Sequence, residues 1–237
     1  MFSIRSCLRI LATLALPLVA MAGHAGEIEL PAELEAQAQV VRAERAGYWE
    51  KTLVVRFPAS RRALSTVEGF VDARAALNHS AHPRLWAEVA SEFMDSDGDG
   101  GKAYVEHVHR KLAGLLGIER AGFATMATAA DVDNQAVVTR AYGPLVVTVV
   151  ATAGAKTNAM RTGVDEGLHI EGENQAKRPH GTINIMVLTN ARLTDGAMAR
   201  AIVTVTEGKT AALGDLKVPS TYTPGVQATG TGTDSVI

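Results

Sequence analysis

The stretch that decides the fold is Thr182–Leu216, which reads TINIMVLTNARLTDGAMARAIVTVTEGKTAALGDL. Residues 182–190 alternate, with two isoleucines and a valine on one face and an asparagine, a methionine and a leucine on the other. Because apolar groups occupy both faces, we expect a strand that is covered on both sides. Thr194 is a suitable N-cap for a helix that continues to about Leu216. The apolar stripe of this helix is Met198, Ile202, Val205, Ala212 and Leu216.

Strands and helices also alternate outside this stretch. Residues 135–142 and 145–152 are rich in β-branched residues and flank Gly143-Pro144, which predicts a hairpin. Further elements are predicted upstream: strands at Thr52–Phe57, Arg62–Thr66 and Ala73–Leu77, helices at Pro83–Met94 and Ala103–Leu116, and a polar helix or extended lead-in at residues 27–47. Interleaved elements with an antiparallel pair predict an α+β fold, with mixed β-sheets layered against helices. Residues 26–237 are expected to form a single domain, because no long Pro/Ser-rich linker divides them.

Residues 1–25 have the organisation of a secretory signal peptide. Arg5 and Arg9 precede an apolar run, Ile10–Val19, and small residues then permit cleavage after Ala22 or Ala25. This run has about half of the roughly twenty residues that a transmembrane helix needs. We therefore expect cleavage and a periplasmic location, with a membrane anchor left in place as the alternative.

Composition excludes several classes of site from the predicted mature chain. The only cysteine is Cys7, so the mature chain would have no disulfide, thiolate metal site or cysteine nucleophile. Loss of Arg5 and Arg9 without any acidic residue would move the formal net charge from −2 to −4. This mild acidity gives no electrostatic reason to expect a nucleic-acid partner.

Three segments together resemble the adenosylcobinamide amidohydrolase family of corrinoid salvage. They are VVATAGAKTNAMRTG (Val149–Gly163), HGTINIMVLTNARLTDGAMARAIVTVTEGKTAALGDL (His180–Leu216) and QATGTGTDSVI (Gln227–Ile237). The resemblance implies an enzyme that hydrolyses the amide between a corrin carboxyl group and aminopropanol, releasing adenosylcobyric acid. The order of elements also resembles αββα sandwich amide hydrolases with an N-terminal nucleophile, although a fold alone does not assign a nucleophile.

The segment Thr229–Asp234 brings hydroxyls, a carboxylate and approachable backbone N–H groups together, as an oxyanion pocket requires. With the resemblance, we predict Thr231, Asp234 and Glu207 as catalytic residues, Glu207 as the general base. The predicted substrate-binding residues are Asn78, Asn158, Asn184, Thr229, Gly230, Gly232 and Lys209. Simpler alternatives are a Gly/Thr-rich turn for the segment, an Asx turn at Asn158, a solvated helix residue at Glu207 and a lysine extending to solvent at Lys209.

A second motif, DSDGDGGKAYVE at Asp95–Glu106, fits the EF-hand calcium loop. Its expected ligands are Asp95, Asp97, Asp99 and Glu106. Lys102 stands where such loops normally carry a branched apolar residue, and the chain has no second loop. A solvated acidic connector is therefore the alternative, and a bound calcium ion would serve as a structural brace.

Two other functions remain open from the sequence. Family members continue beyond the GTGTD segment with a further strand and helix, whereas this chain ends at Ile237. This difference favours a catalytically inactive corrinoid-binding protein as the second expectation. The third is a calcium-binding module built on residues 95–106.

Overall fold

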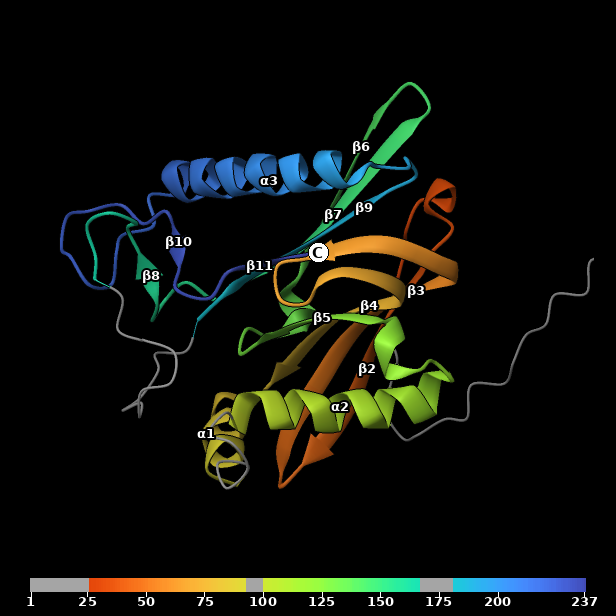
Figure 1. The fold of residues 1–237 in the computed structure, drawn as a ribbon. Helices are drawn as coiled ribbons and strands as arrows, with labels where there is room; N and C mark the ends of the chain where they lie inside the picture. The colour runs from red at the N-terminus through yellow and green to blue at the C-terminus, as the bar shows by residue number, and fades with distance from the viewer. Residues whose placement is uncertain (1–25, 93–99, 167–180) are drawn as a thin grey trace, which may run out of the picture.

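The computed structural model describes residues 26–92, 100–166 and 181–237. Two β-sheets pack face to face, and helices cover the outer face of each sheet (Figure 1). The layers are therefore helix, sheet, sheet, helix, which confirms the predicted α+β class in the form of an αββα sandwich. No helix in these three ranges is both long and apolar enough to cross a membrane.

The first sheet contains five strands in sequence order. They are β1 (Gly26–Ile28), β2 (Gln37–Arg45), β3 (Tyr48–Ser65), β4 (Gly69–Ala81) and β5 (Phe123–Thr128). Neighbours are antiparallel except for β4 and β5, which are parallel. The strands expected at 52–57 and 62–66 form one strand, β3, whose register with β4 shifts between Arg56 and Arg61. The lead-in at 27–47 contains β1, a short 3-10 helix at Ala32–Leu34, and β2.

Helices α1 (Pro83–Glu92) and α2 (Gly100–Leu116) cover the outer face of this sheet. Two further 3-10 helices, at Arg120–Gly122 and Val132–Asn134, lie before and after β5. The helices confirm the predicted helical segments, and α2 begins three residues earlier than predicted.

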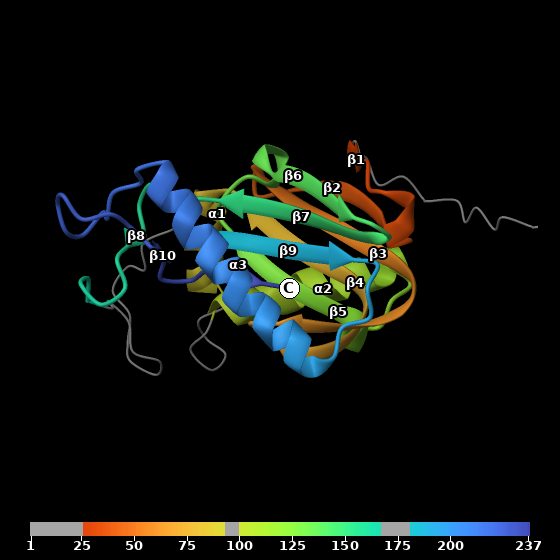
Figure 2. The same ribbon diagram turned by 90° about the horizontal axis from the view of Figure 1, so that it is seen from above.

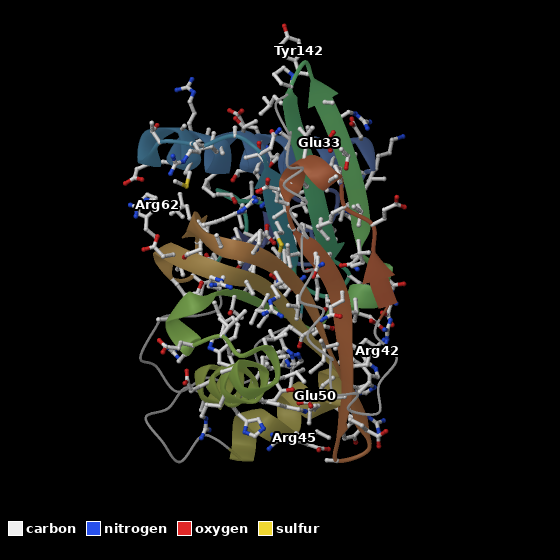
Figure 3. The ribbon with its side chains drawn as sticks, turned by 90° about the vertical axis from the view of Figure 1, so that its right-hand side faces the viewer. Glu33, Arg42, Arg45, Glu50, Arg62 and Tyr142 are labelled. Atoms are coloured by element: carbon white, nitrogen blue, oxygen red, sulfur yellow. The ribbon has the colours of Figure 1, made fainter. Side chains whose placement is uncertain are left out.

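The second sheet has the spatial order β11 (Ser235–Val236), β9 (Ile183–Thr189), β7 (Leu145–Ala153) and β6 (Ala136–Tyr142). β6 and β7 form the predicted hairpin, and Tyr142 stands exposed at its tip (Figure 3). β11 pairs parallel to β9. Helix α3 (Asp195–Asp215) crosses the outer face of this sheet (Figure 2). A small sheet of β8 (Ala159–Met160) and β10 (Gly230–Thr231) lies beside the C-terminal half of α3 (Figure 1).

Strand β9 is covered on both sides, as its sequence predicts. Ile183 and Ile185 pack toward α3, whereas Met186 and Leu188 join the core between the two sheets. The polar member of the inner face, Asn184, is fully buried. A buried polar side chain requires hydrogen-bond partners. Asn184, near the start of β9, therefore indicates that polar groups lie between the two sheets at this end of the strand.

Helix α3 begins as predicted, because the Thr194 hydroxyl accepts a hydrogen bond from the backbone N–H of Ala197 at 3.2 Å. The second half of its predicted apolar stripe is wrong. Leu213 is buried there, while Ala212 is exposed and Leu216, beyond the last helical turn, is 74% exposed. On the inner face of α3, Lys209 stands between Val205 and Leu213. It takes this position because its ammonium forms an ion pair with Asp234 on that side of the helix.

A buried polar cluster lies between the first sheet and α2. The Tyr104 hydroxyl donates to Glu50 at 2.5 Å and lies 3.1 Å from His79 Nε2. On its other side, His79 Nδ1 lies 2.9 Å from the Thr52 hydroxyl. Burial lowers the pKa of His79 to about 4, against a weaker opposing effect of the Glu50 carboxylate.

This shift predicts that stability falls in mild acid. The unfolded chain binds a proton on His79 below about pH 6.5, whereas the folded chain binds it only below about pH 4. This group therefore lowers the free energy of unfolding by about 2 to 3 kcal/mol as the pH falls from 7 to 4.5. Burial also lowers the pKa of His107 and His109, which adds in the same direction.

Urea unfolding at pH 7 and pH 4.5 measures this loss. A His79→Gln variant keeps a polar side chain but removes the titrating group, so its stability should vary less between the two values. An unchanged pH dependence in that variant would show that other groups cause the acid sensitivity.

Candidate active site

The C-terminal segment is fastened to the end of β9 by the carboxylate of Asp234. One carboxylate oxygen accepts from the backbone N–H of Ile183 at 3.0 Å and from the Thr231 hydroxyl at 2.5 Å. The other accepts from the backbone N–H of Thr231 at 3.0 Å and forms an ion pair with Lys209 of α3. Both charged side chains are only 14% exposed. Asp234 therefore joins β9, β10 and α3.

Gly230 makes this arrangement possible. A Cβ atom at that position would lie 2.5 Å from the Asp234 carboxylate and 2.6 Å from Lys209 Nζ. Any side chain would push the two charges apart. The glycine predicted for close approach of a ligand thus serves a close approach of two protein side chains.

Next to this ion pair, a backbone carbonyl is held by two side-chain donors. The oxygen of Gly181 accepts from Asn158 Nδ2 at 3.1 Å and from the Thr233 hydroxyl at 3.0 Å. The donors come from segments 23 and 52 residues away in the sequence. Two fixed donors that converge on one amide oxygen have the geometry of an oxyanion hole.

Asn158 is oriented by a second layer of hydrogen bonds. The Tyr222 hydroxyl donates to Asn158 Oδ1 at 2.7 Å, which turns Nδ2 toward Gly181. The loop that carries Tyr222 is in turn held by Asp165, which accepts from the hydroxyls of Ser220 and Thr223. Those hydroxyls hold the pKa of Asp165 below its usual range, so its carboxylate stays a hydrogen-bond acceptor.

The residue after Gly181, Thr182, carries a buried hydroxyl. Thr182 is 5% exposed, and its hydroxyl lies 2.6 Å from the backbone oxygen of Thr233 and 3.3 Å from Asn184 Oδ1. Asn184 is fixed because its Nδ2 donates to Asn78 Oδ1 at 2.8 Å and to the backbone oxygen of Ala127 at 3.1 Å. Asn78 in turn donates to the Thr152 hydroxyl at 3.0 Å. A buried network across both sheets therefore positions Thr182.

The structure brings most of the residues predicted from sequence to this end of the sandwich. Thr231, Asp234 and Lys209 lie together, and Gly232 adjoins Asn158. Asn78 and Asn184 bind each other within the core. Thr229 accepts from the backbone N–H of Thr162, and its carbonyl accepts from the hydroxyl of Thr210 on α3.

Glu207 does not join this group. It lies two residues before Lys209, about 200° around the helix, and it is exposed. Thr204 and Ala211, three and four residues away on the same face of the helix, and Gly208 beside them are exposed as well. The structure thus places the proposed general base on the solvent side of α3.

For the calcium loop, Asp95, Asp97 and Asp99 lie outside the described residues. Glu106 is on α2, where its carboxylate forms an ion pair with Arg120 at 2.5 Å. Within the described ranges, no three His, Cys, Asp or Glu side chains gather as metal ligands would. Calcium binding stays a prediction.

A cavity of about 740 Å³ lies at the opposite end of β9 from the polar groups. It is bounded by β3 around Phe57–Leu64, by the connection from β9 to α3, and by the first half of α3. Neither Asn158 nor Thr182 lines it. The polar site and this cavity are therefore separate, and the amide-binding geometry belongs to the former.

Sequence reasoning missed Gly181, Thr182, Thr233 and Tyr222 as site residues. A single Gly-Thr pair has no characteristic spacing, and Tyr222 lies in an irregular segment after α3. One feature of the sequence could have indicated Gly181 and Thr182: the pair directly precedes a strand that is covered on both faces.

Comparison with known proteins shows the family of the chain. The family model described as adenosylcobinamide amidohydrolase matches residues 32–237. An uncharacterized protein of Methanocaldococcus jannaschii is 40% identical over 197 residues, which cover 79% of this chain and 72% of that protein. No solved structure matches. Because the family match extends over nearly all of the described residues, the chain belongs to the adenosylcobinamide amidohydrolase family.

Proposed function

We propose that this protein hydrolyses the amide bond between the corrin carboxyl group and aminopropanol in adenosylcobinamide or a related corrinoid, releasing adenosylcobyric acid. The observation that carries this proposal is the amide oxygen of Gly181 held between Asn158 Nδ2 and the Thr233 hydroxyl. The family membership gives the substrate class, and this pair of donors gives a place where an amide carbonyl is bound.

Amide hydrolysis needs donors for the negative charge that develops on the carbonyl oxygen. A side-chain amide and a hydroxyl supply them here, and both belong to rigid surroundings. Tyr222 fixes Asn158, while the Asp234 carboxylate fixes the segment that carries Thr233. Donors held in place before the reaction lower the barrier more than donors that must reorient.

The predicted removal of residues 1–25 adds a proposal about location. A secreted enzyme of this class would meet corrinoids outside the cytoplasm, in transit toward synthesis inside the cell. Its mildly acidic mature chain carries no cysteine whose oxidation would matter there.

Incubation of the purified protein with adenosylcobinamide tests the proposal. We expect equimolar adenosylcobyric acid and aminopropanol, separated by chromatography and identified by mass. Cobyric acid, which lacks the scissile amide, is the matched control and should remain unchanged. Recovery of intact adenosylcobinamide bound to the protein would contradict the proposal and favour a corrinoid-binding protein.

A further inference from the structure

We propose that the chain cuts itself between Gly181 and Thr182, and that the new N-terminal Thr182 is the nucleophile of the amide hydrolysis; the second half rests on the function proposed above. The carboxylate beside the Thr231 hydroxyl, that of Asp234, is already engaged by Lys209 and by the backbone N–H groups of Ile183 and Thr231, which makes it a weak base. An N-terminal threonine carries its own base, because its α-amine lies next to its hydroxyl.

The first observation is that the carbonyl of the bond to be cut is already bound as a reacting carbonyl would be. Asn158 and Thr233 both donate to the Gly181 oxygen, at 3.1 and 3.0 Å. The carbonyl precedes a hydroxyl-bearing residue, so the Thr182 hydroxyl can reach its carbon through a five-membered ring. Two donors on the oxygen stabilise the negative charge that such an attack produces.

The second observation is the backbone conformation at Gly181. Its φ is +154°, and a Cβ there would lie 2.5 Å from the backbone oxygen of Gly154 and 3.0 Å from Asn158 Cβ. Only glycine fits this position. The bond at the head of β9 is therefore held in a conformation that other residues rarely adopt, and cleavage would release that constraint.

The third observation is the confinement of the attacking group. The Thr182 side chain is almost fully buried, and its hydroxyl lies among Thr233 and Asn184. Asn184 is itself immobilised by Asn78 and by the Ala127 carbonyl. These contacts restrict the positions that the Thr182 hydroxyl can take relative to the carbonyl that directly precedes it in the chain.

The chemistry balances with water as the only co-reactant. The Thr182 hydroxyl oxygen bonds to the Gly181 carbonyl carbon, the C–N bond breaks, and the hydroxyl proton passes to the leaving nitrogen. Water then hydrolyses the resulting ester, which gives a Gly181 carboxylate and restores the Thr182 hydroxyl beside a free amine.

The same donors then become available to substrate. Once Gly181 carries a free carboxylate it is no longer tied to Thr182, and Asn158 and Thr233 can bind the carbonyl oxygen of a corrinoid amide. Thr182 remains in place, because Gly154 donates to its carbonyl at 2.8 Å and β9 pairs with β7 along its whole length. The two chains should therefore stay associated after the cut.

Intact mass under denaturing conditions and N-terminal sequencing test the cleavage without any substrate. The wild type should give two chains, one ending at Gly181 and one beginning at Thr182. Thr182→Ala should remain a single chain, and Thr182→Ser, which keeps a hydroxyl, should be cut. Thr189→Ala changes the same residue type at the other end of β9 and should be cut as the wild type is.

Two results would overturn self-cleavage: a wild-type chain that stays whole after prolonged incubation, or a Thr182→Ala chain that is cut at the same bond. Hydrolysis of adenosylcobinamide by an uncut chain would leave the proposed function standing while removing this inference. Conversely, a cut chain that releases no aminopropanol would support self-cleavage and contradict the proposed hydrolysis of adenosylcobinamide.

Discussion

Replacing Asn158 by alanine is expected to lower kcat for adenosylcobinamide by about 10²- to 10³-fold with little change in KM. The variant loses the Nδ2 donor that now binds the Gly181 oxygen at 3.1 Å. That donor acts on the charge that develops during the reaction, so its loss affects the chemical step more than substrate binding. Asn158→Asp keeps the size but replaces the donor by an oxygen, and should be at least as slow.

The control is Asn190→Ala, at the other end of β9. Asn190 also makes two hydrogen bonds, to the backbone of Val146 and Pro144, but these hold the β6–β7 hairpin. Its kcat should stay near that of the wild type. Since Asn158 contacts the bond proposed for self-cleavage, kcat is normalised to the processed fraction of each protein. Equal kcat in Asn158→Ala and Asn190→Ala would contradict the oxyanion assignment.

Asp234→Asn is expected to destabilise the fold by about 3 kcal/mol, because it leaves the largely buried ammonium of Lys209 without a counter-charge. It also weakens the acceptors for the backbone N–H groups of Ile183 and Thr231. The midpoint of urea unfolding measures this loss.

A second substitution separates the ion pair from the other contacts. Lys209→Met keeps the volume of the side chain and removes its charge. The double variant Lys209→Met/Asp234→Asn contains no unpaired charge at this position. Its loss in free energy of unfolding should therefore be smaller than the sum of the two single-variant losses, by at least about 1 kcal/mol. Strict additivity would show that the two side chains do not stabilise each other.

The sequence predicted the fold where local pattern and tertiary environment agree. The two apolar faces of β9 required cover on both sides, and α3 and the first sheet supply it. The stripe of α3 was wrong after Val205, because a charged residue, Lys209, takes an inner position through its ion pair with Asp234. Hydrophobic periodicity does not predict an inward-facing lysine, because its acceptor lies 25 residues away.

The sequence predicted which residues lie at the candidate site, but not what most of them do there. The GTGTD segment does lie beside Asn158 and Lys209, but Asp234 and Gly230 act there as structural fastening. The amide-binding geometry depends on the oxygen of Gly181, a backbone atom that no side-chain motif marks. Placing it required the contacts from Asn158 and Thr233, which only the folded chain brings together.

The most direct test of the site is single-turnover hydrolysis of adenosylcobinamide by wild type, Thr182→Ala and Thr189→Ala, followed by the release of aminopropanol. We expect release by the wild type and by Thr189→Ala, and none above the uncatalysed rate by Thr182→Ala. Release by Thr182→Ala at the wild-type rate would place the chemistry elsewhere in the molecule.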